Sequence, residues 1–222
     1  MDTARAGSRS MAIAFYELFG ITDAFNGIPF AGRTDLAIVK DAIALHGISD
    51  GDRVIAQLKE AYFIHLGRLL YEASGRVLPG VMDLLELLSS HKHAYLGLAT
   101  GNFRRSGMMK LERYELAGYF KEGGFGDETI VRAEVVAEAI RRCQEAASVV
   151  FALEDIYVIG DTAHDIESGK ANGARTIGVA TGPSSTEQLA QHQPTLVFQD
   201  LQAALPFFGS LLEPAAEPSS RS

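Results

Sequence analysis

Hydrophobic and polar positions along the chain change their spacing at about residue 75. Before that point, apolar residues recur at steps of three and four, which is typical of helices that bury one face. This pattern predicts helices over residues 4–18, 35–46 and 52–72. Gly20 and Gly47 follow the first two segments, at positions where glycine commonly ends a helix. No strand pattern occurs in this half, so we predict an all-helical domain.

From residue 78 onward, short apolar runs alternate with helical segments. Four runs have the length of strands, at residues 94–100, 156–159, 176–179 and 195–198. Helical patterns occur at residues 81–90, 104–114, 132–147, 166–172 and 184–191. The last of these opens with a capping box of Ser184 and Glu187. We assign the glycine-rich residues 123–127 to a connection, since they lack the context of a dinucleotide loop. Apolar strands alternating with helices predict a parallel sheet covered on both faces.

Composition and charge narrow the possible functions. The chain has 222 residues and a net charge of −8, and 47% of its residues are hydrophobic. The acidic balance argues against a nucleic-acid partner, because such a protein must neutralise phosphates. The single cysteine, Cys143, allows no internal disulfide and favours a reducing compartment. No apolar run reaches about eighteen residues, and the polar start lacks a signal-peptide pattern. We therefore expect a cytoplasmic protein without a membrane partner.

Polar residues follow two of the predicted strands, at the edge of the sheet where ligands bind in such folds. Thr100, Gly101 and Asn102 supply a hydroxyl, a close backbone approach and an amide just before a helix. This set suits phosphate, although a turn with a helix cap would use the same residues. Asp161 and Asp165 follow the second strand, four residues apart. Two carboxylates exceed what a helix cap needs and suit Mg²⁺.

Taken together, these segments resemble the haloacid dehalogenase (HAD) superfamily of hydrolases, in particular phosphoglycolate-phosphatase-like members with a helical cap. Residues 98–102 match the second family motif and residues 160–166 match the fourth. The resemblance runs from residue 1 to about residue 208. It implies an α/β fold, with a Rossmann-like parallel sheet core and an inserted all-helical cap domain. The implied division is a remnant at residues 1–7, the cap at 8–76, the core at 77–208 and a flexible tail at 209–222.

The family resemblance also implies roles for the residues that follow the strands. Thr100 would hydrogen-bond the transferring phosphoryl group, and Gly101 and Asn102 would help to hold its oxygens. Asp161 would bind Mg²⁺ directly, and Asp165 would support the ion through water. Mg²⁺ is therefore the expected cofactor.

Three further residues are candidates for the site. The third family motif is a cation, often lysine, and Arg132 is its best match, although this arginine has glutamates nearby on its own helix as alternative partners. Arg33 precedes a cap helix and would pair with a substrate carboxylate or second phosphate. Bridging Asp35 is the alternative role for Arg33. His164 lies inside the fourth motif, where it would contact substrate or point to water.

The first family motif is absent from this sequence. It is a buried strand ending in Asp-x-Asp-Gly-Thr, whose first Asp attacks phosphorus and whose second acts as general acid and base. Residues 1–3 resemble the positions directly after that motif. We therefore expect the first core strand to be missing and the chain as written to be inactive. A start site assigned too late, a real truncation and an engineered fragment are the alternatives, and the upstream genomic sequence would distinguish them.

The sequence thus predicts the architecture of a Mg²⁺-dependent phosphatase for a small phosphorylated metabolite, as a monomer or homodimer. A haloacid dehalogenase of the same superfamily fits less well, because displacement of a halide needs no Mg²⁺ site such as Asp161 and Asp165 suggest. A phosphomutase shares the core and differs in the cap. A non-catalytic phosphate-binding relic is the alternative from another class.

Overall fold

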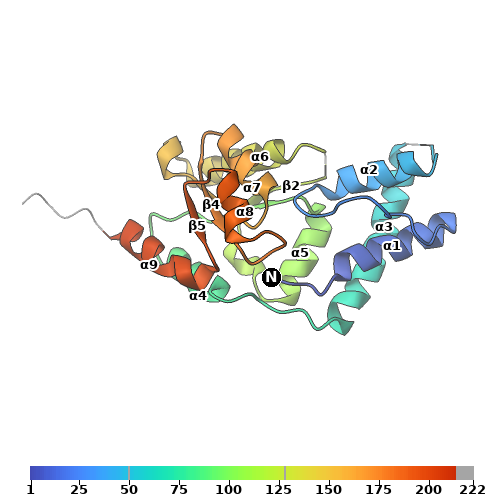
Figure 1. The fold of residues 1–222 in the computed structure, drawn as a ribbon, viewed down its shortest axis with the longest axis horizontal. Helices are drawn as coiled ribbons and strands as arrows, with labels where there is room; N and C mark the ends of the chain where they lie inside the picture. The colour runs from blue at the N-terminus through green and yellow to red at the C-terminus, as the bar shows by residue number, and fades with distance from the viewer. Residues whose placement is uncertain (50, 128, 214–222) are drawn as a thin grey trace, which may run out of the picture.

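The computed structural model describes residues 1–49, 51–127 and 129–213, which form two lobes lying side by side (Figure 1). The helical lobe contains α1 (Ala6–Phe19), α2 (Asp35–Leu45) and α3 (Asp52–Glu72). The α/β lobe contains the strands and the remaining helices. The three helices predicted for the first half of the chain are therefore confirmed.

The helical lobe has a hydrophobic core of its own. Its fully buried side chains include Phe15, Ile38, Ile43 and Leu66, at the spacing that the sequence pattern predicted. Phe103 is also part of this cluster, although it belongs to the α/β lobe, where it precedes α5 (Arg104–Arg113). The two lobes therefore share hydrophobic packing at this point.

The α/β lobe contains two parallel sheets. In the first, β1 (Gly97–Thr100) pairs with β2 (Glu122–Phe125). In the second, the strand order is β3 (Tyr157–Gly160), β4 (Arg175–Val179) and β5 (Leu196–Phe198). The predicted parallel strands are confirmed, and β2 is an additional strand that the sequence pattern missed.

β2 corrects the assignment of residues 123–127 to a connection. A Cβ on Gly123 would lie 2.5 Å from the Leu98 carbonyl oxygen, and one on Gly124 would lie 1.9 Å from that of Val135. The strand thus lies so close to its neighbours that glycine is required at both positions. Glycine weakens the strand signal in a sequence, which is why the segment looked like a loop.

Helices cover the sheets from both sides. α6 (Arg132–Ala147) and α7 (Ala163–Ala171) contact each other and pack on β1, β2, β3 and β4. α4 (Val81–Ser89) and α9 (Leu201–Leu212) contact each other and bury Ile177 and Val179 of β4 on the opposite side. The lobe is completed by α8 (Thr186–Gln191) and by the short 3₁₀ helices η1 (Ala117–Tyr119) and η2 (Leu153–Asp155).

Several element boundaries differ from the predicted ones. The capping box of α8 is formed by Ser185 and Gln188 rather than Ser184 and Glu187, because the Ser185 hydroxyl accepts from the Gln188 N–H. α7 begins at residue 163, three residues before the predicted start. α9 extends to residue 212, so residues 209–212 of the predicted flexible tail are helical. Residues 214–222 of that tail lie outside the described residues. The division into domains stays a prediction.

The two sheets are not joined to each other, since no pairing links β1 to β3 within the described residues. Beside the sheets, Asp2 and Arg76 exchange two backbone hydrogen bonds of 2.8 Å in an antiparallel bridge. The chain therefore enters the helical lobe next to the point where it leaves. Throughout the described ranges, we find no helix with the length and apolar character that crossing a membrane requires.

The close packing of β2 on α6 gives a test of the fold. We expect Gly124→Ala to lower the free energy of unfolding by about 1–3 kcal/mol, because the new Cβ would meet helix backbone that cannot yield. Gly118→Ala is the matched control, since no atom lies within 4 Å of its Cβ position. It should change stability by less than about 0.5 kcal/mol. Urea unfolding followed by circular dichroism measures both variants, and equal effects would contradict the packing described.

Candidate functional site

A cavity of about 330 Å³ lies where the two lobes meet. Residues of α1, α2 and α3 line it from the helical lobe, and the residues after β1 and β3 line it from the α/β lobe. The cavity brings together most of the predicted site residues, namely Arg33, Thr100, Gly101, Asn102, Arg132, Asp161 and Asp165. The carboxyl ends of the parallel strands are therefore where the polar site lies.

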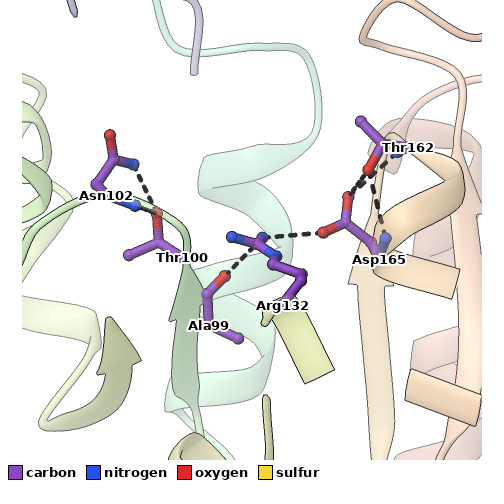
Figure 2. A network of polar contacts seen from close by, with 6 residues as sticks. All are labelled: Ala99, Thr100, Asn102, Arg132, Thr162 and Asp165. Carbon is purple, nitrogen blue, oxygen red and sulfur yellow. Dashed lines mark hydrogen bonds and ion pairs between the residues drawn. The ribbon is translucent and has the colours of Figure 1, made fainter. Parts of the chain in front are cut away.

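Thr100 and Asn102 form a compact donor group at the end of β1. The backbone N–H and the side-chain amide of Asn102 both donate to the Thr100 hydroxyl oxygen, at 3.2 and 2.6 Å (Figure 2). Because the oxygen accepts twice, the hydroxyl hydrogen is left to donate outward. Between them, Gly101 is contacted by the helical lobe, since a Cβ there would lie 2.1 Å from the Arg33 carbonyl oxygen.

Lys110 of α5 is a site residue that the sequence analysis missed. Its ammonium group donates to the side-chain oxygen of Asn102. This bond fixes the orientation of the amide, so that the NH₂ group faces Thr100. Lys110 is only 9% exposed, and burial lowers its pKa. Lys110 follows the buried Ser106 by four residues, so both side chains lie on the buried face of α5.

Asp35 of α2, the alternative partner that the sequence suggested for Arg33, connects the two lobes. Its carboxylate is buried and accepts hydrogen bonds from the Phe103 N–H at 3.0 Å and the Ser106 hydroxyl at 3.1 Å. These groups belong to the first turn of α5, whose N-cap residue Phe103 offers no capping side chain. Burial raises the pKa of Asp35, and the nearby Lys110 ammonium opposes that rise. A residue of one lobe thus caps a helix of the other.

A second carboxylate reinforces this contact between the lobes. Asp127 accepts from the Arg104 N–H at 2.5 Å and pairs with Lys59 of α3 at 2.9 Å. The Lys59 ammonium also lies 4.5 Å from the centre of the Phe103 ring. The amino end of α5 is therefore held by groups from both lobes.

Arg132 lies at the start of α6, between the ends of the two sheets (Figure 2). It donates to the Ala99 carbonyl oxygen at 3.3 Å and to Asp165 at 2.9 Å. Both charged side chains are largely buried, at 17% and 11% exposure. The guanidinium thus points into the site instead of pairing with the glutamates of its own helix. Its Nε atom is buried and has no hydrogen-bond partner among the residues that the structure describes.

Asp161 and Asp165 have different surroundings. Asp165 completes the capping box of α7, since its second oxygen accepts from the Thr162 N–H at 3.2 Å and hydroxyl at 2.7 Å (Figure 2). Asp165 therefore serves as a helix cap, a role that the sequence argument left open for one of the two carboxylates. Burial raises the pKa of Asp161, and the charge of Asp165 raises it further. Asp161 is thus a carboxylate whose negative charge its surroundings compensate incompletely.

This donor set fits Mg²⁺ in kind and number. Magnesium ions usually take one or two carboxylates and keep several waters. Asp161 is partly exposed to the cavity, and Asp165 stands beside it. Within residues 1–49, 51–127 and 129–213, no three His, Cys, Asp or Glu side chains gather as a metal cluster. The site therefore suits a hydrated divalent ion and lacks the ligands of a closed structural metal site.

The two predicted substrate contacts differ in outcome. Arg33 lines the cavity, but its guanidinium pairs with Asp41 at 2.7 Å rather than with Asp35. His164 is exposed and is not among the lining residues. Its ring packs against Gly32, which lies in the helical lobe before α2, because a Cβ on Gly32 would lie 2.5 Å from the His164 Cδ2 atom. His164 therefore contacts the other lobe at the edge of the cavity.

Comparison with known proteins agrees with this architecture. A family model described as HAD-hydrolase-like matches residues 133–204. A phosphoglycolate phosphatase of Pseudomonas fluorescens is 28% identical over 196 residues, covering 86% of this chain and 65% of that protein. A 5'-nucleotidase of Pseudomonas aeruginosa is 33% identical over 137 residues, covering 60% and 58%. The chain thus spans less than two thirds of the length of both relatives.

The fold comparison covers more of the chain. The crystal structure of a hydrolase from Pseudomonas syringae superposes with a TM-score of 0.67 at 17% identity, covering 95% of this chain and 93% of the other. Together with the parallel strands and the polar cavity at their ends, these findings define an α/β protein of the HAD-like fold. The sequence and fold comparisons together support a phosphatase-like protein of the haloacid dehalogenase superfamily.

The pair of Arg132 and Asp165 gives a test of the site geometry. We expect Arg132→Gln alone to lower the free energy of unfolding by about 1–3 kcal/mol, because it leaves the buried Asp165 oxygen without its charged partner. Asp165→Asn in the same chain should recover part of that loss. The double-mutant cycle, measured by urea unfolding, should give a coupling energy of at least about 0.5 kcal/mol. Additive effects would show that the two side chains do not interact.

Proposed function

We propose that this site binds the phosphoryl group of a small phosphate monoester and has the arrangement of a Mg²⁺-dependent phosphatase. One observation carries the proposal. The Thr100 and Asn102 donor group after β1 and the Asp161 and Asp165 pair after β3 line one cavity, with Arg132 between them. Donors on one side and carboxylates on the other are what a phosphoryl group and its metal ion require.

Each residue of this chain would have a distinct task. The Thr100 hydroxyl would donate to a phosphoryl oxygen, because its own oxygen already accepts from Asn102. Arg132 would offset negative charge on the phosphoryl oxygens. Since the transition state of phosphoryl transfer is loose, positioning and charge do most of the work. Held on three separate elements, these groups would position the phosphoryl group without large rearrangement.

Mg²⁺ is the proposed cofactor. Asp161 would hold the ion directly and Asp165 would support it through water, leaving Asp165 free to keep its bonds to Arg132 and Thr162. When bound, the ion supplies positive charge that stabilises the transferring phosphoryl group. The raised pKa of Asp161 supports this role, because a nearby cation would relieve the charge that burial disfavours.

The substrate is proposed to be a small phosphorylated metabolite. A cavity of about 330 Å³ is at the lower end of the range for ligand pockets, which favours a small phosphate ester over a large one. The relatives named above, a phosphoglycolate phosphatase and a 5'-nucleotidase, support a phosphate monoester as the substrate class. We further propose a cytoplasmic location and a monomer or homodimer, with no nucleic-acid partner.

Phosphate binding at the Thr100 and Asn102 donor group can be measured directly. Calorimetry should detect binding of inorganic phosphate in the presence of Mg²⁺ and weaker binding when the metal is chelated. Thr100→Val should reduce phosphate affinity about tenfold through the loss of one hydrogen bond to a charged group. Asp161→Asn should abolish the effect of Mg²⁺ while leaving metal-free binding in place. Phosphate binding that ignores both substitutions would place the anion elsewhere and overturn the proposal.

Turnover requires an acidic side chain that is free to attack phosphorus. The sequence contains no Asp-x-Asp-Gly-Thr, and the acidic side chains lining the cavity are Asp35, Asp161 and Asp165 within the described part. Asp35 is occupied by hydrogen bonds, and the other two serve the proposed metal site. We propose that the 222-residue chain binds phosphate but does not hydrolyse an aryl phosphate with Mg²⁺ present. Turnover that exceeds the buffer rate and is lost in Asp161→Asn would contradict this prediction.

A further inference from the structure

A second and larger cavity lies at the opposite edge of the β1–β2 sheet from the proposed phosphate site. Its volume is about 620 Å³, against about 330 Å³ for the first cavity. Tyr95 and Leu96, just before β1, and Lys121, just before β2, line it. Within the described part of the chain, the two cavities share no lining residue. The amino ends of β1 and β2 thus border a separate space, which we call the second cavity.

The second cavity is too far from the proposed phosphate site to belong to it. α6 carries Arg132 at its amino end, whereas Cys143 and Ala146, near its carboxyl end, line the second cavity. From the rise per residue of an α-helix, Arg132 and Ala146 are about 20 Å apart. A small phosphate ester cannot span that distance. A ligand of the second cavity would therefore be a different molecule from the substrate.

The charged groups of the second cavity favour an anion. The chain has a net charge of −8, yet Lys92, Lys121 and His91 line this cavity beside one carboxylate, that of Glu122, among the described residues. Neither lysine has a hydrogen bond or an ion pair with the described residues. The His91 Nδ1 atom accepts from the His93 N–H at 3.4 Å, so the neutral ring carries its hydrogen on Nε2 and can donate it. The cavity thus offers several donors that lack an acceptor.

The uncharged part of the lining favours a flat ring. Tyr95 and Tyr119 supply aromatic side chains, and α6 contributes the small side chains of Ala146 and Ala147. The Tyr95 ring packs on Phe151 with centroids 5.2 Å apart, but 51% of the residue remains exposed. Aromatic rings gain stabilisation from one another beyond the area that they bury. A ligand ring would therefore find tyrosine surface that the protein itself leaves uncovered.

We propose that the second cavity binds a small molecule in which a planar aromatic ring carries an anionic group. The ring would lie against Tyr95 and Tyr119, and the anion would accept from Lys92 and Lys121. A volume of about 620 Å³ lies within the range of pockets for such ligands. The proposal uses no residue of the first cavity, so it stands or falls apart from the proposed phosphatase function.

Three probes without phosphate test this site. Naphthoate combines the aromatic ring with the anion, naphthylmethanol keeps the ring without the charge, and decahydronaphthoate keeps the charge without the aromatic ring. Calorimetry measures all three, and because the chain contains no tryptophan, the fluorescence of the two aromatic probes can also be followed. Naphthoate should bind at least about tenfold more tightly than either of the others, since it alone satisfies both the lysines and the tyrosines.

Two lysine variants test the anion contact. Lys121→Gln should weaken naphthoate binding about threefold, as expected for the loss of one exposed ion pair, and should leave naphthylmethanol binding unchanged. Lys170→Gln is the matched control, because Lys170 is exposed on α7 and lines neither cavity. It removes the same charge and should change neither affinity. Both lysines are exposed, so neither substitution is expected to unfold the protein.

Cys143 reports where naphthoate binds. It is the single cysteine of the chain and lines the second cavity, so bound naphthoate should slow its alkylation by iodoacetamide. Burial raises the pKa of this thiol, and the reaction is therefore followed at alkaline pH. Inorganic phosphate, for which the first cavity is proposed, should leave the rate unchanged.

The outcomes decide the second cavity without reference to the first. Equal affinity for naphthoate and naphthylmethanol, equal effects of Lys121→Gln and Lys170→Gln, or alkylation of Cys143 that naphthoate does not slow would each overturn the proposal. None of these results would bear on phosphate binding at Thr100. Tighter binding of naphthoate that Lys121→Gln weakens and that protects Cys143 would establish the site.

Discussion

The rest of the site depends on the guanidinium of Arg132, which bridges two sheets that share no backbone pairing in the described residues. On one side it contacts the carbonyl of Ala99 in β1, and on the other the carboxylate of Asp165 in α7. Without this bridge, the donors after β1 and the carboxylates after β3 would have no direct link inside the α/β lobe. The packing of α6 on α7 already holds the two sheets together. The Arg132 guanidinium adds the polar contact that fixes the donor group after β1 relative to the carboxylate of Asp165.

The helical lobe is positioned by buried polar contacts that converge on α5. Asp35 satisfies the first turn of this helix, and Asp127 joins it to Lys59 of α3. The same helix carries Lys110, which orients Asn102 beside Thr100. The contact between the lobes and the geometry of the donor group are therefore properties of a single helix. A change in the contact between the lobes at α5 would therefore also change the orientation of Asn102 beside Thr100.

The sequence predicted those features that follow from local hydrophobic periodicity or from the polar residues directly after the strands. The helical half, the parallel strands and the grouping of Thr100 with Asp161 and Asp165 were all accessible in this way. β2 was missed because the close packing that requires Gly124 leaves no strand signal in the sequence. Lys110 was missed because its role arises only where the second lobe meets α5, and contacts between distant segments leave no periodicity to read.

Phe103 has a consequence for how the lobes can move. It belongs to the α/β lobe, yet its ring is buried in the hydrophobic core of the helical lobe. Any rigid swing of the helical lobe away from the cavity must withdraw this ring into water, at a cost of about 1.5–3 kcal/mol. That cost alone favours the closed arrangement by roughly ten- to a hundredfold. Any ligand that binds only when the lobes are apart must therefore supply the free energy that exposes the Phe103 ring to water.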